Sequence, residues 1–251
     1  MTTADDHALA RDLAERSGRL LLDLRARGGD PDVLRKAGDR LSHEFLAAEL
    51  TARRPADAVL SEEGIDDKAR LAADRVWIVD PLDGTREFGD DGRTDWAVHV
   101  ALWERGPGLT AGAVALPAQG RVLSTVTPPE LSPAGNTPIR IVVSRSRAPQ
   151  LVRDVASRLG AELVTCGSAG AKVATVLDGE TDAYLHAGGF YEWDTAAPVA
   201  VATAAGCHAS RIDGAALAYN REDPLMPDIL VCRPAIAGLL LEAIREATHA
   251  I

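Results

Sequence analysis

VWIVDPLDGTREF, residues 76–88, is an apolar run that ends in two carboxylates and a tight turn. Its first residues favour β-structure and predict a buried strand. Pro81 cannot donate a further ladder hydrogen bond, and Gly84 allows a sharp bend. Asp80 and Asp83 therefore stand where a strand stops and a turn or helix begins. Taken alone, the pattern is that of an Asp-rich turn in which Asp83 caps a helix.

Two further carboxylates stand at the ends of predicted elements. The segment SEE, residues 61–63, closes a short strand, so Glu62 is expected at the same sheet edge. The segment EWDTAAP supplies Asp194 at the start of a helix in the second half of the chain. Hard oxygen ligands of this kind suit Mg²⁺ or Mn²⁺, and a cluster of carboxylates without cations would repel. The sequence therefore predicts a metal site built from Glu62, Asp80, Asp83 and Asp194.

Hydrophobic patterning predicts two helices and a sheet in the first half. The first helix ends at Gly28 and turns five leucines to one side, namely Leu9, Leu13, Leu20, Leu21 and Leu24. The second helix is expected from Asp39 to Arg54, with an apolar side made of Leu41, Phe45 and Leu50. Strands are expected to begin at Ala58, Val76, Trp96, Leu109 and Gly120.

The segment TPPELSPAGNTP, residues 127–138, is the clearest breaker and marks the boundary between two halves, 1–130 and 131–251. After it, apolar strands such as IRIVVS alternate with helical patterns such as PQLVRDVASRLG. This alternation indicates an α/β layer with a mixed or parallel sheet. The first half carries most of the predicted metal ligands. The second half carries Asp194 and the residues expected to recognise the substrate.

Composition narrows the class of protein. The 251 residues are 46% hydrophobic and carry a formal net charge of −10, without a basic stripe that would coat a nucleic acid. The three cysteines, Cys166, Cys207 and Cys232, form no CxxC or Cys/His pattern, so neither a disulfide framework nor a zinc site is expected. The N-terminus does not resemble a signal peptide, and no apolar run reaches about 18 residues. We expect a soluble cytoplasmic protein.

The motif DPLDGT, with EE upstream and WDxAA…AG downstream, resembles the inositol monophosphatase superfamily of Mg²⁺-dependent, lithium-sensitive phosphatases. The order and spacing match across nearly the whole chain. Within that superfamily, VWIVDPLDGTREF, DAYLHAGG and EWDTAAP resemble the CysQ branch of 3′-phosphoadenosine 5′-phosphate phosphatases. The resemblance implies an αβαβα layered sandwich and a role in sulfur assimilation. It also implies two or three Mg²⁺ ions, with Mn²⁺ as a substitute, and inhibition by Li⁺.

The resemblance also assigns roles around the metals. Glu62, Asp80 and the Leu82 carbonyl would hold one ion, and a second ion would be held by Asp80, Asp83 and Asp194. Thr85, with Glu62, would orient the attacking water. The amides of Gly84 and Thr85 would receive phosphate oxygens.

Asp39 matches a family aspartate that binds a further metal or assists water activation. The family usually carries a Thr-x-x-Asp pattern there, whereas this chain reads KAGD. The alternative is that Asp39 is the N-cap of a helix starting near Arg40.

The second half supplies the candidates for substrate recognition. The loop VVSRSR offers Ser144 and Arg147, of which Arg147 would stack on a base or pair with a phosphate, or else is a solvated loop cation. The segment GSAGAK offers Ser168 and Lys172, which would approach a sugar or phosphate. The alternatives are plain helix capping at Ser168 and a surface position for Lys172. The remaining expectations are that His186 lies on a strand running toward the metals, that Trp193 packs beside Asp194, and that His99 belongs to the core.

The function expected from the resemblance is hydrolysis of 3′-phosphoadenosine 5′-phosphate to AMP and phosphate, with its phosphosulfate as a second substrate. An inositol monophosphatase or a fructose-1,6-bisphosphatase is the alternative with the same chemistry. An inactive nucleotide- or metal-sensing protein is the alternative from a different class. That alternative would be marked by a lost metal ligand, and all four predicted carboxylates are present. The oligomeric state stays open, with a homodimer as one option.

Overall fold

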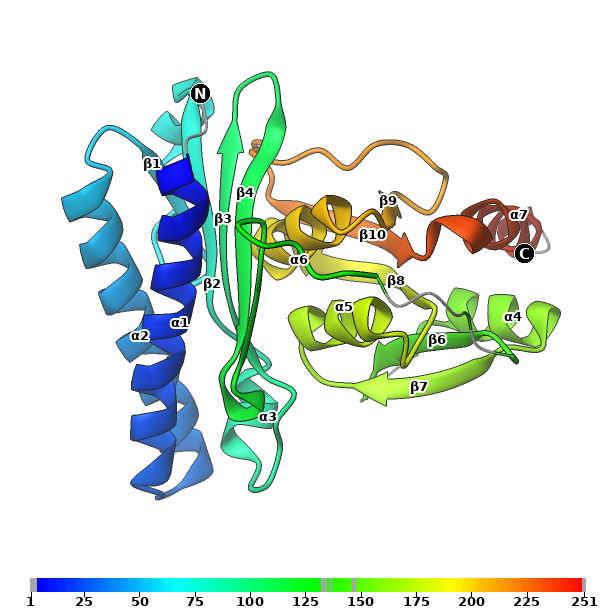
Figure 1. Ribbon diagram of the computed structural model, residues 1–251, viewed down its shortest axis with the longest axis horizontal. Coiled ribbons are helices and arrows are strands. Elements are labelled where there is room, and N and C mark those ends of the chain that lie inside the picture. Colours follow the sequence, from blue (N-terminus) through cyan, green and yellow to red (C-terminus); the bar gives the residue numbers. More distant parts are fainter. Residues whose placement is uncertain (1–3, 132–134, 136, 146–147, 250–251) are drawn as a thin grey trace.

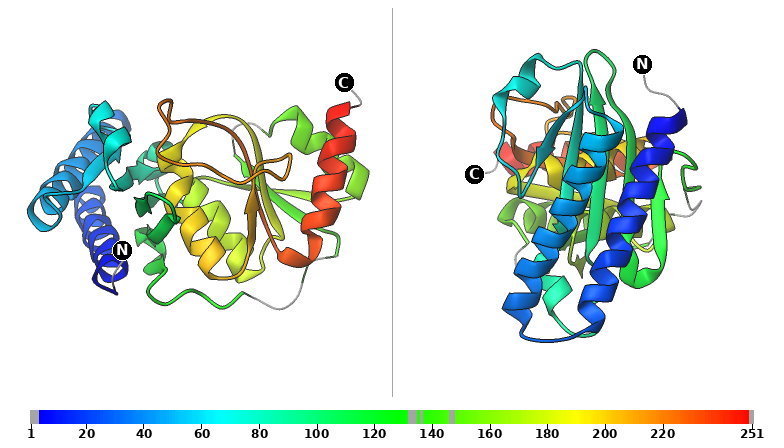
Figure 2. Two further views of the ribbon diagram at one scale, coloured as in Figure 1. Left: turned by 90° about the horizontal axis from the view of Figure 1, so that it is seen from above. Right: turned by 90° about the vertical axis from the view of Figure 1, so that its left-hand side faces the viewer.

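Helices and sheets alternate in layers across the molecule (Figure 1). The computed structural model describes residues 4–131, 135, 137–145 and 148–249. Helices α1 (Ala4–Ala26) and α2 (Pro31–Arg53) pack on one face of the first sheet, and α6 (Glu192–Ala204) packs on its other face. Helix α5 (Ala169–Asp178) lies beside α6 between the two sheets (Figure 2). The expected αβαβα layered sandwich is confirmed.

The two sheets divide the chain in sequence order. The first sheet has the order β1-β2-β3-β4-β5, with bounds Ala58–Ser61, Arg75–Asp83, Ala97–Glu104, Gly108–Leu116 and Arg121–Ser124. The second has the order β7-β6-β8-β10-β9, in which the strands β6 to β10 are Arg140–Ser144, Glu162–Cys166, Ala183–Tyr191, His208–Ser210 and Leu225–Cys232. Strand β6 pairs in parallel with β7 and β8, whereas β10 pairs antiparallel with β8 and β9, so the second sheet is mixed.

The outer layer of the second sheet and the short helices complete the fold. Helices α4 (Gln150–Leu159) and α7 (Ala237–His249) contact each other beyond the second sheet. Helix α3 and the 3₁₀ helices η1, η2 and η3 are short, with bounds Thr85–Gly89, Lys68–Ala72, Pro117–Gln119 and Pro234–Ile236. Within the described residues, no helix has both the length and the apolar character to cross a bilayer.

Strand β2 is buried on both faces, which explains its unbroken apolar run. Trp77 and Val79 belong to the core under α1 and α2. Val76 and Ile78 belong to the core shared with α5 and α6. Because the strand is enclosed by both cores, the residues at its end are held on a rigid mount.

Helix α2 differs from the expectation. It begins at Pro31, eight positions before Asp39, because the Asp30 side chain accepts from the backbone N–H groups of Asp32 and Val33. The interpretation of Asp39 as an N-cap is therefore wrong. The expected apolar side is confirmed in part, since Leu50 is buried and Phe45 packs against the core, whereas Leu41 is only partly buried and belongs to no core cluster of the described residues. The residues of α2 that are buried are Leu34, Gly38, Ser42, Leu46 and Leu50.

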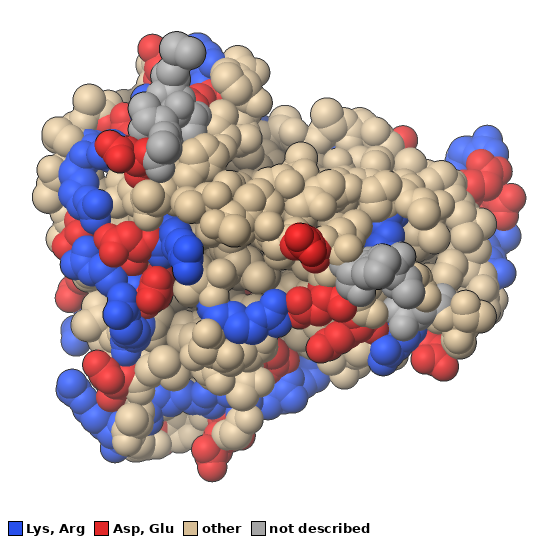
Figure 3. All heavy atoms as spheres, in the orientation of Figure 1, with Lys and Arg blue, Asp and Glu red and all other residues tan. Residues whose placement is uncertain are grey.

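Charges on the surface are mixed rather than sorted. On the face shown in Figure 3, basic and acidic side chains are interspersed, most densely over the helices of the first half. Several charges of α1 and α2 pair with each other, such as Arg16 with Glu49 at 2.8 Å and Arg53 with Asp12 at 2.7 Å.

Candidate functional site

Three of the predicted metal ligands meet at the ends of β1 and β2. The two strands run in parallel, with Ser61 opposite Val79, so Glu62, which follows β1, lies beside Asp80 of β2. Their carboxyl groups lie within hydrogen-bonding distance of each other. Asp80 is buried, and its Oδ1 accepts a hydrogen bond of 3.0 Å from the Leu82 N–H. The prediction that these carboxylates share one sheet edge agrees with this geometry.

Asp194 arrives from the other half, in the first turn of α6. Its Oδ2 accepts a hydrogen bond of 2.5 Å from the Tyr191 N–H, which fixes the side chain and leaves Oδ1 for another partner. Its charge contributes to raising the pKa of Asp80, and the charge of Asp83 in turn helps to raise the pKa of Asp194. Trp193, expected to pack beside Asp194, stacks on Tyr191 with ring centroids 4.7 Å apart and planes at 13°.

The electrostatics of this cluster call for cations. Burial, followed by the charges of Glu62 and Asp83, raises the pKa of Asp80 well above its usual range. Desolvation raises the pKa of Glu62 to about 7, although the residue as a whole is exposed. Burial and the charge of Asp83 raise the pKa of Asp194 to about 7. Carboxylates that resist ionisation together are a donor set suited to divalent metal ions, which would stabilise their charged forms.

Thr85 connects two other predicted site groups. Its Oγ1 lies 3.1 Å from the Leu82 carbonyl oxygen and 3.2 Å from Asp39 Oδ1. Asp39 reaches the site from the interior of α2, and burial followed by the charge of Glu63 raises its pKa to about 6. The structure therefore brings Asp39, Thr85 and Leu82 together, next to the carboxylates of β2.

Asp83 is anchored by the second half of the molecule. Its Oδ2 accepts a hydrogen bond of 3.1 Å from the N–H of Gly170, in the first turn of α5. Gly84, at a φ of +84°, brings the chain so close to α5 that a Cβ there would lie 3.2 Å from the Ser168 Cβ. Ser168 caps α5, with its Oγ accepting from the Ala171 N–H at 2.9 Å. Capping is therefore a role that Ser168 has in the fold.

Lys172 is not a surface lysine, so that alternative is wrong. The residue is 3% exposed, and its Nζ donates to the carbonyl of Gly167 and lies 5.4 Å from the centre of the Tyr184 ring. Burial lowers the pKa of Lys172, while the charge of Asp83 acts in the opposite direction. A buried cation therefore stands behind the carboxylate cluster.

The remaining predicted recognition residues surround the same region. His186 lies on β8, 5.0 Å from the Phe190 ring, and burial followed by the Lys172 charge lowers its pKa to about 4. Ser144 is the last residue of β6, and the next residue, Arg145, pairs with Glu87 of α3 at 3.1 Å. Arg147 lies outside the described residues.

One residue at the site was not anticipated. His99 was expected to belong to the core, and it is fully buried, but its Nε2 lies 3.2 Å from Asp83 Oδ2. It stands directly opposite Asp80 in the antiparallel pairing of β2 with β3. Cross-strand partners share a face of the sheet, so this pairing would have placed His99 beside the carboxylates. The sequence alone does not give the register.

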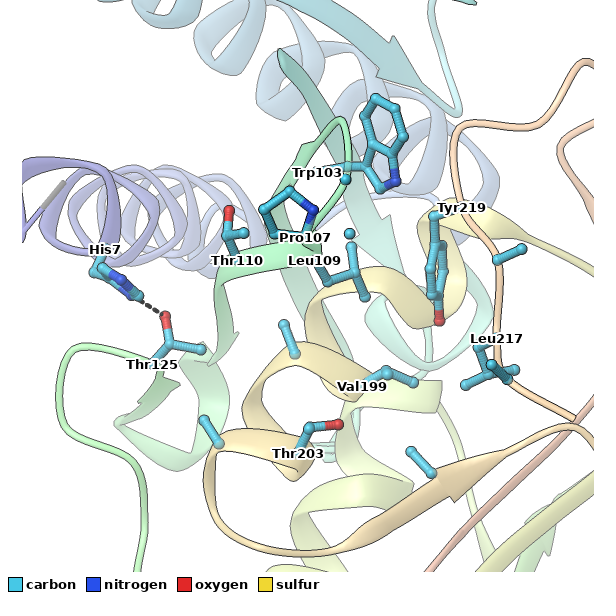
Figure 4. Close-up of a pocket in the computed structure, with 17 residues that line it drawn as sticks. His7, Trp103, Pro107, Leu109, Thr110, Thr125, Val199, Thr203, Leu217 and Tyr219 are labelled. Carbon is cyan, nitrogen blue, oxygen red and sulfur yellow. Dashed lines mark hydrogen bonds between the residues drawn. The ribbon is translucent and has the colours of Figure 1, made fainter. Parts of the chain in front are cut away.

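A cavity of about 700 Å³ lies away from these residues (Figure 4). It is bordered by Trp103 and Pro107 of the β3–β4 hairpin region, by Thr203 near the end of α6, and by Tyr219. None of the predicted site residues lines it, and Asp194 is at the opposite end of α6. The carboxylate cluster, rather than this cavity, is the candidate active site.

Known proteins match both the sequence and the fold. Residues 22–249 match the model of the inositol monophosphatase family. The chain is 52% identical to the 3′-phosphoadenosine 5′-phosphate phosphatase of Mycobacterium leprae, over 96% of this chain and 94% of that protein. The identity to the protein of the same name from Mycobacterium tuberculosis is 53%, over 92% of this chain and 90% of the relative.

A solved structure gives the same answer for the fold. The crystal structure of CysQ from Bacteroides thetaiotaomicron superposes with a TM-score of 0.77 at 27% identity, covering 91% of this chain and 97% of that one. The motif DPLDGT, the layered fold and the match over residues 22–249 lead to one conclusion. The chain belongs to the inositol monophosphatase family.

Proposed function

We propose that this protein is a Mg²⁺-dependent phosphatase that removes the 3′-phosphate of 3′-phosphoadenosine 5′-phosphate, giving AMP and phosphate. The observation that carries the proposal is the convergence of Glu62, Asp80, Asp83 and Asp194 in a chain 52–53% identical to phosphatases of that name. The complete carboxylate set argues against an inactive sensor. The phosphosulfate analogue is a second substrate under the same proposal.

The protein's own groups divide the work. Glu62, Asp80, the Leu82 carbonyl, Asp83 and Asp194 would hold the Mg²⁺ ions. Bound divalent cations supply charge neutralisation for the phosphate dianion and acidify a water molecule. Thr85, whose hydroxyl is held between Leu82 and Asp39, orients the attacking water together with Glu62. Hydrolysis by water needs no covalent phosphoenzyme.

Recognition of the nucleoside is assigned to the second half. The groups assigned to the nucleoside and its second phosphate are Ser144, Ser168, Lys172 and His186, together with Arg147, which lies outside the described residues. His186 with a pKa of about 4 is neutral near pH 7, so it can meet a base without adding charge. Lys172 supplies the positive charge that a second phosphate needs.

A phosphate-release panel tests the assignment. The purified protein with Mg²⁺ is assayed on 3′-phosphoadenosine 5′-phosphate, inositol 1-phosphate and fructose 1,6-bisphosphate. We expect the highest kcat/KM for the nucleotide. A higher value for either polyol phosphate would refute the proposed substrate, and no release from any of them would refute the phosphatase itself.

Two controls accompany the panel. Asp83→Asn removes the charge but keeps the size of the side chain, so activity should be abolished while the circular dichroism spectrum stays that of the wild type. Li⁺ should inhibit by displacing a weakly held Mg²⁺, which is measured as a lower steady-state rate in LiCl than in NaCl of equal ionic strength. Full activity of Asp83→Asn at saturating Mg²⁺ would contradict the metal assignment.

A further inference from the structure

The imidazole of His99 joins the two halves of the metal site. It projects from β3, is fully buried, and stands between Asp83 on β2 and the start of α6. Its Nδ1 lies 3.2 Å from the backbone carbonyl oxygen of Trp193, the residue before Asp194. Its Nε2 lies 3.2 Å from Asp83 Oδ2. One ring therefore contacts a predicted metal ligand, Asp83, and the residue that precedes another, Asp194.

The contact with Trp193 fixes which nitrogen carries the hydrogen. A backbone carbonyl only accepts hydrogen bonds, so Nδ1 must be the donor. In the neutral ring, Nε2 then carries a lone pair. Within the described residues, Nε2 makes no hydrogen bond, although it is enclosed by protein. A buried acceptor without a donor is costly, and a lone pair next to a carboxylate oxygen adds repulsion.

Gly170 and Asp83 lie close to Nε2. Gly170 packs so closely against the ring that a Cβ there would lie 2.4 Å from Nε2. The N–H of the same glycine already binds Asp83 Oδ2 at 3.1 Å, so it is engaged and does not serve Nε2. One ring nitrogen of His99 and one oxygen each from Asp80 and Asp83 all lie within 4.8 Å of one another, and Nε2 is the nitrogen that lies 3.2 Å from Asp83. A cation among these three atoms would satisfy the unpaired nitrogen and relieve the carboxylate repulsion together.

We propose that His99 Nε2 is a nitrogen ligand of the metal site, and that it makes the position beside Asp83 prefer Mn²⁺ and similar transition-metal ions to Mg²⁺. A metal-bound histidine commonly donates its other ring N–H to a backbone carbonyl, as Nδ1 does here to Trp193. Imidazole nitrogen suits transition-metal ions, whereas Mg²⁺ favours oxygen and water. The inference rests on the proposed function only in taking the carboxylate cluster to be a metal site.

Pulsed electron paramagnetic resonance of Mn²⁺ tests this without any substrate. The full-length protein is stripped of metal with a chelator, dialysed and reloaded with Mn²⁺. Nitrogen bound directly to Mn²⁺ gives a ¹⁴N modulation of the electron spin echo. We expect that modulation in the wild type and in His208→Asn, and its loss in His99→Asn. His208 is the matched control, because it bonds Ser210 on β9 at 2.8 Å and belongs to no predicted site.

Calorimetric titration with Mn²⁺ and with Mg²⁺ measures the preference. In His99→Asn, the Kd for Mn²⁺ should rise by roughly 10- to 100-fold, which is the loss in metal affinity that follows mutation of a residue supporting a metal ligand. The Kd for Mg²⁺ should rise by much less. An equal rise for both ions would overturn the proposal, because His99 would then only position Asp83. Absence of ¹⁴N modulation in the wild type would overturn it regardless of how the variant folds. Neither readout uses phosphate release. The proposal about His99 is therefore tested even if the protein does not hydrolyse 3′-phosphoadenosine 5′-phosphate.

Discussion

At the scale of single residues, Lys172 shows how burial changes the meaning of a charge. It lies in α5, 3% exposed, behind the carboxylate cluster rather than on the surface. A buried ammonium is costly unless it has partners, and here it has the Gly167 carbonyl and the Tyr184 ring. A charge kept in such a place serves either the fold or an anionic ligand, and substitution separates the two.

Lys172→Met tests the second role, since methionine keeps most of the volume. Loss of a charge-assisted phosphate contact costs about 1.5–3 kcal/mol, or about ten- to a hundredfold. We expect that loss in kcat/KM for 3′-phosphoadenosine 5′-phosphate and a much smaller one for a monophosphate that lacks the second phosphate. Lys68→Met is the control, because Lys68 is an exposed lysine paired with Asp66 and its loss should leave the ratio unchanged. An equal decrease for both substrates would assign Lys172 to the fold or to the metal site.

At the scale of elements, η1 is tied to the segment before β10 by a buried polar contact. Arg70 is 1% exposed and donates to Asn220 Oδ1 at 2.7 Å. Asp66, beside η1, accepts from Arg70 Nε at 2.6 Å. The Asn220 N–H in turn binds Glu192 at the start of α6 at 2.7 Å. These contacts connect η1, which lies between β1 and β2 in the chain, to α6, the helix that carries Asp194.

The Asp66–Arg70 contact predicts a pH dependence of stability. The hydrogen bond from Arg70 is the main reason that the pKa of Asp66 falls below its usual range, to about 2, in the folded protein. Because the folded pKa is depressed, this stability is present above the unfolded pKa and is lost as pH falls through the folded one. Asp66→Asn should therefore lower the free energy of unfolding by about 2 kcal/mol at pH 7 and by clearly less at pH 3.

Urea unfolding of the wild type and Asp66→Asn at the two pH values measures this difference. Asp74→Asn is the control, since Asp74 pairs with Arg105 at 2.9 Å while its side chain is 85% exposed. Its substitution should have little effect at either pH. A difference for Asp66→Asn that does not shrink at pH 3 would mean that its carboxylate charge is not what stabilises η1.

At the scale of the whole molecule, the candidate site lies at a seam, which is the boundary between the first sheet and helix α6 of the second half. Glu62, Asp80 and Asp83 come from the first sheet, and Asp194 comes from α6. Without cations, these carboxylates repel one another across the seam. Metal ions that bind only the folded state should therefore stabilise the assembled halves.

Thermal unfolding with and without Mg²⁺ measures that coupling. At a Mg²⁺ concentration about 100 times the Kd, ligand binding stabilises the folded state by about 2.7 kcal/mol. For a chain of this size, that corresponds to a rise in Tm of roughly 5–10 °C relative to protein in EDTA. Asp194→Asn should reduce the rise, because it removes the ligand supplied by the second half. Identical Tm values in Mg²⁺ and EDTA, at matched ionic strength, would contradict a metal site at the seam.

The sequence by itself determined the elements that carry the chemistry. The unbroken apolar run of β2 reflects burial on both faces, and the position of Asp80 and Asp83 follows from where that run ends. The alternation of strand and helix patterns after residues 127–138 predicted an α/β second layer, and the order of the motifs predicted the family. Local signals were sufficient there because periodicity and turn chemistry act over a few neighbouring residues. The start of α2 was missed although its signal, Asp30 followed by Pro31, is local.

The tertiary structure alone decided how distant elements meet. The bond from Gly170 to Asp83 joins residues 87 positions apart, and the contact of His99 with Trp193 joins residues 94 apart. The burial of Lys172 likewise depends on how α5 lies against β8. Such contacts follow from sheet register and from the packing of one layer on the next. Those are set by the simultaneous fit of many side chains, which no single stretch of the sequence contains.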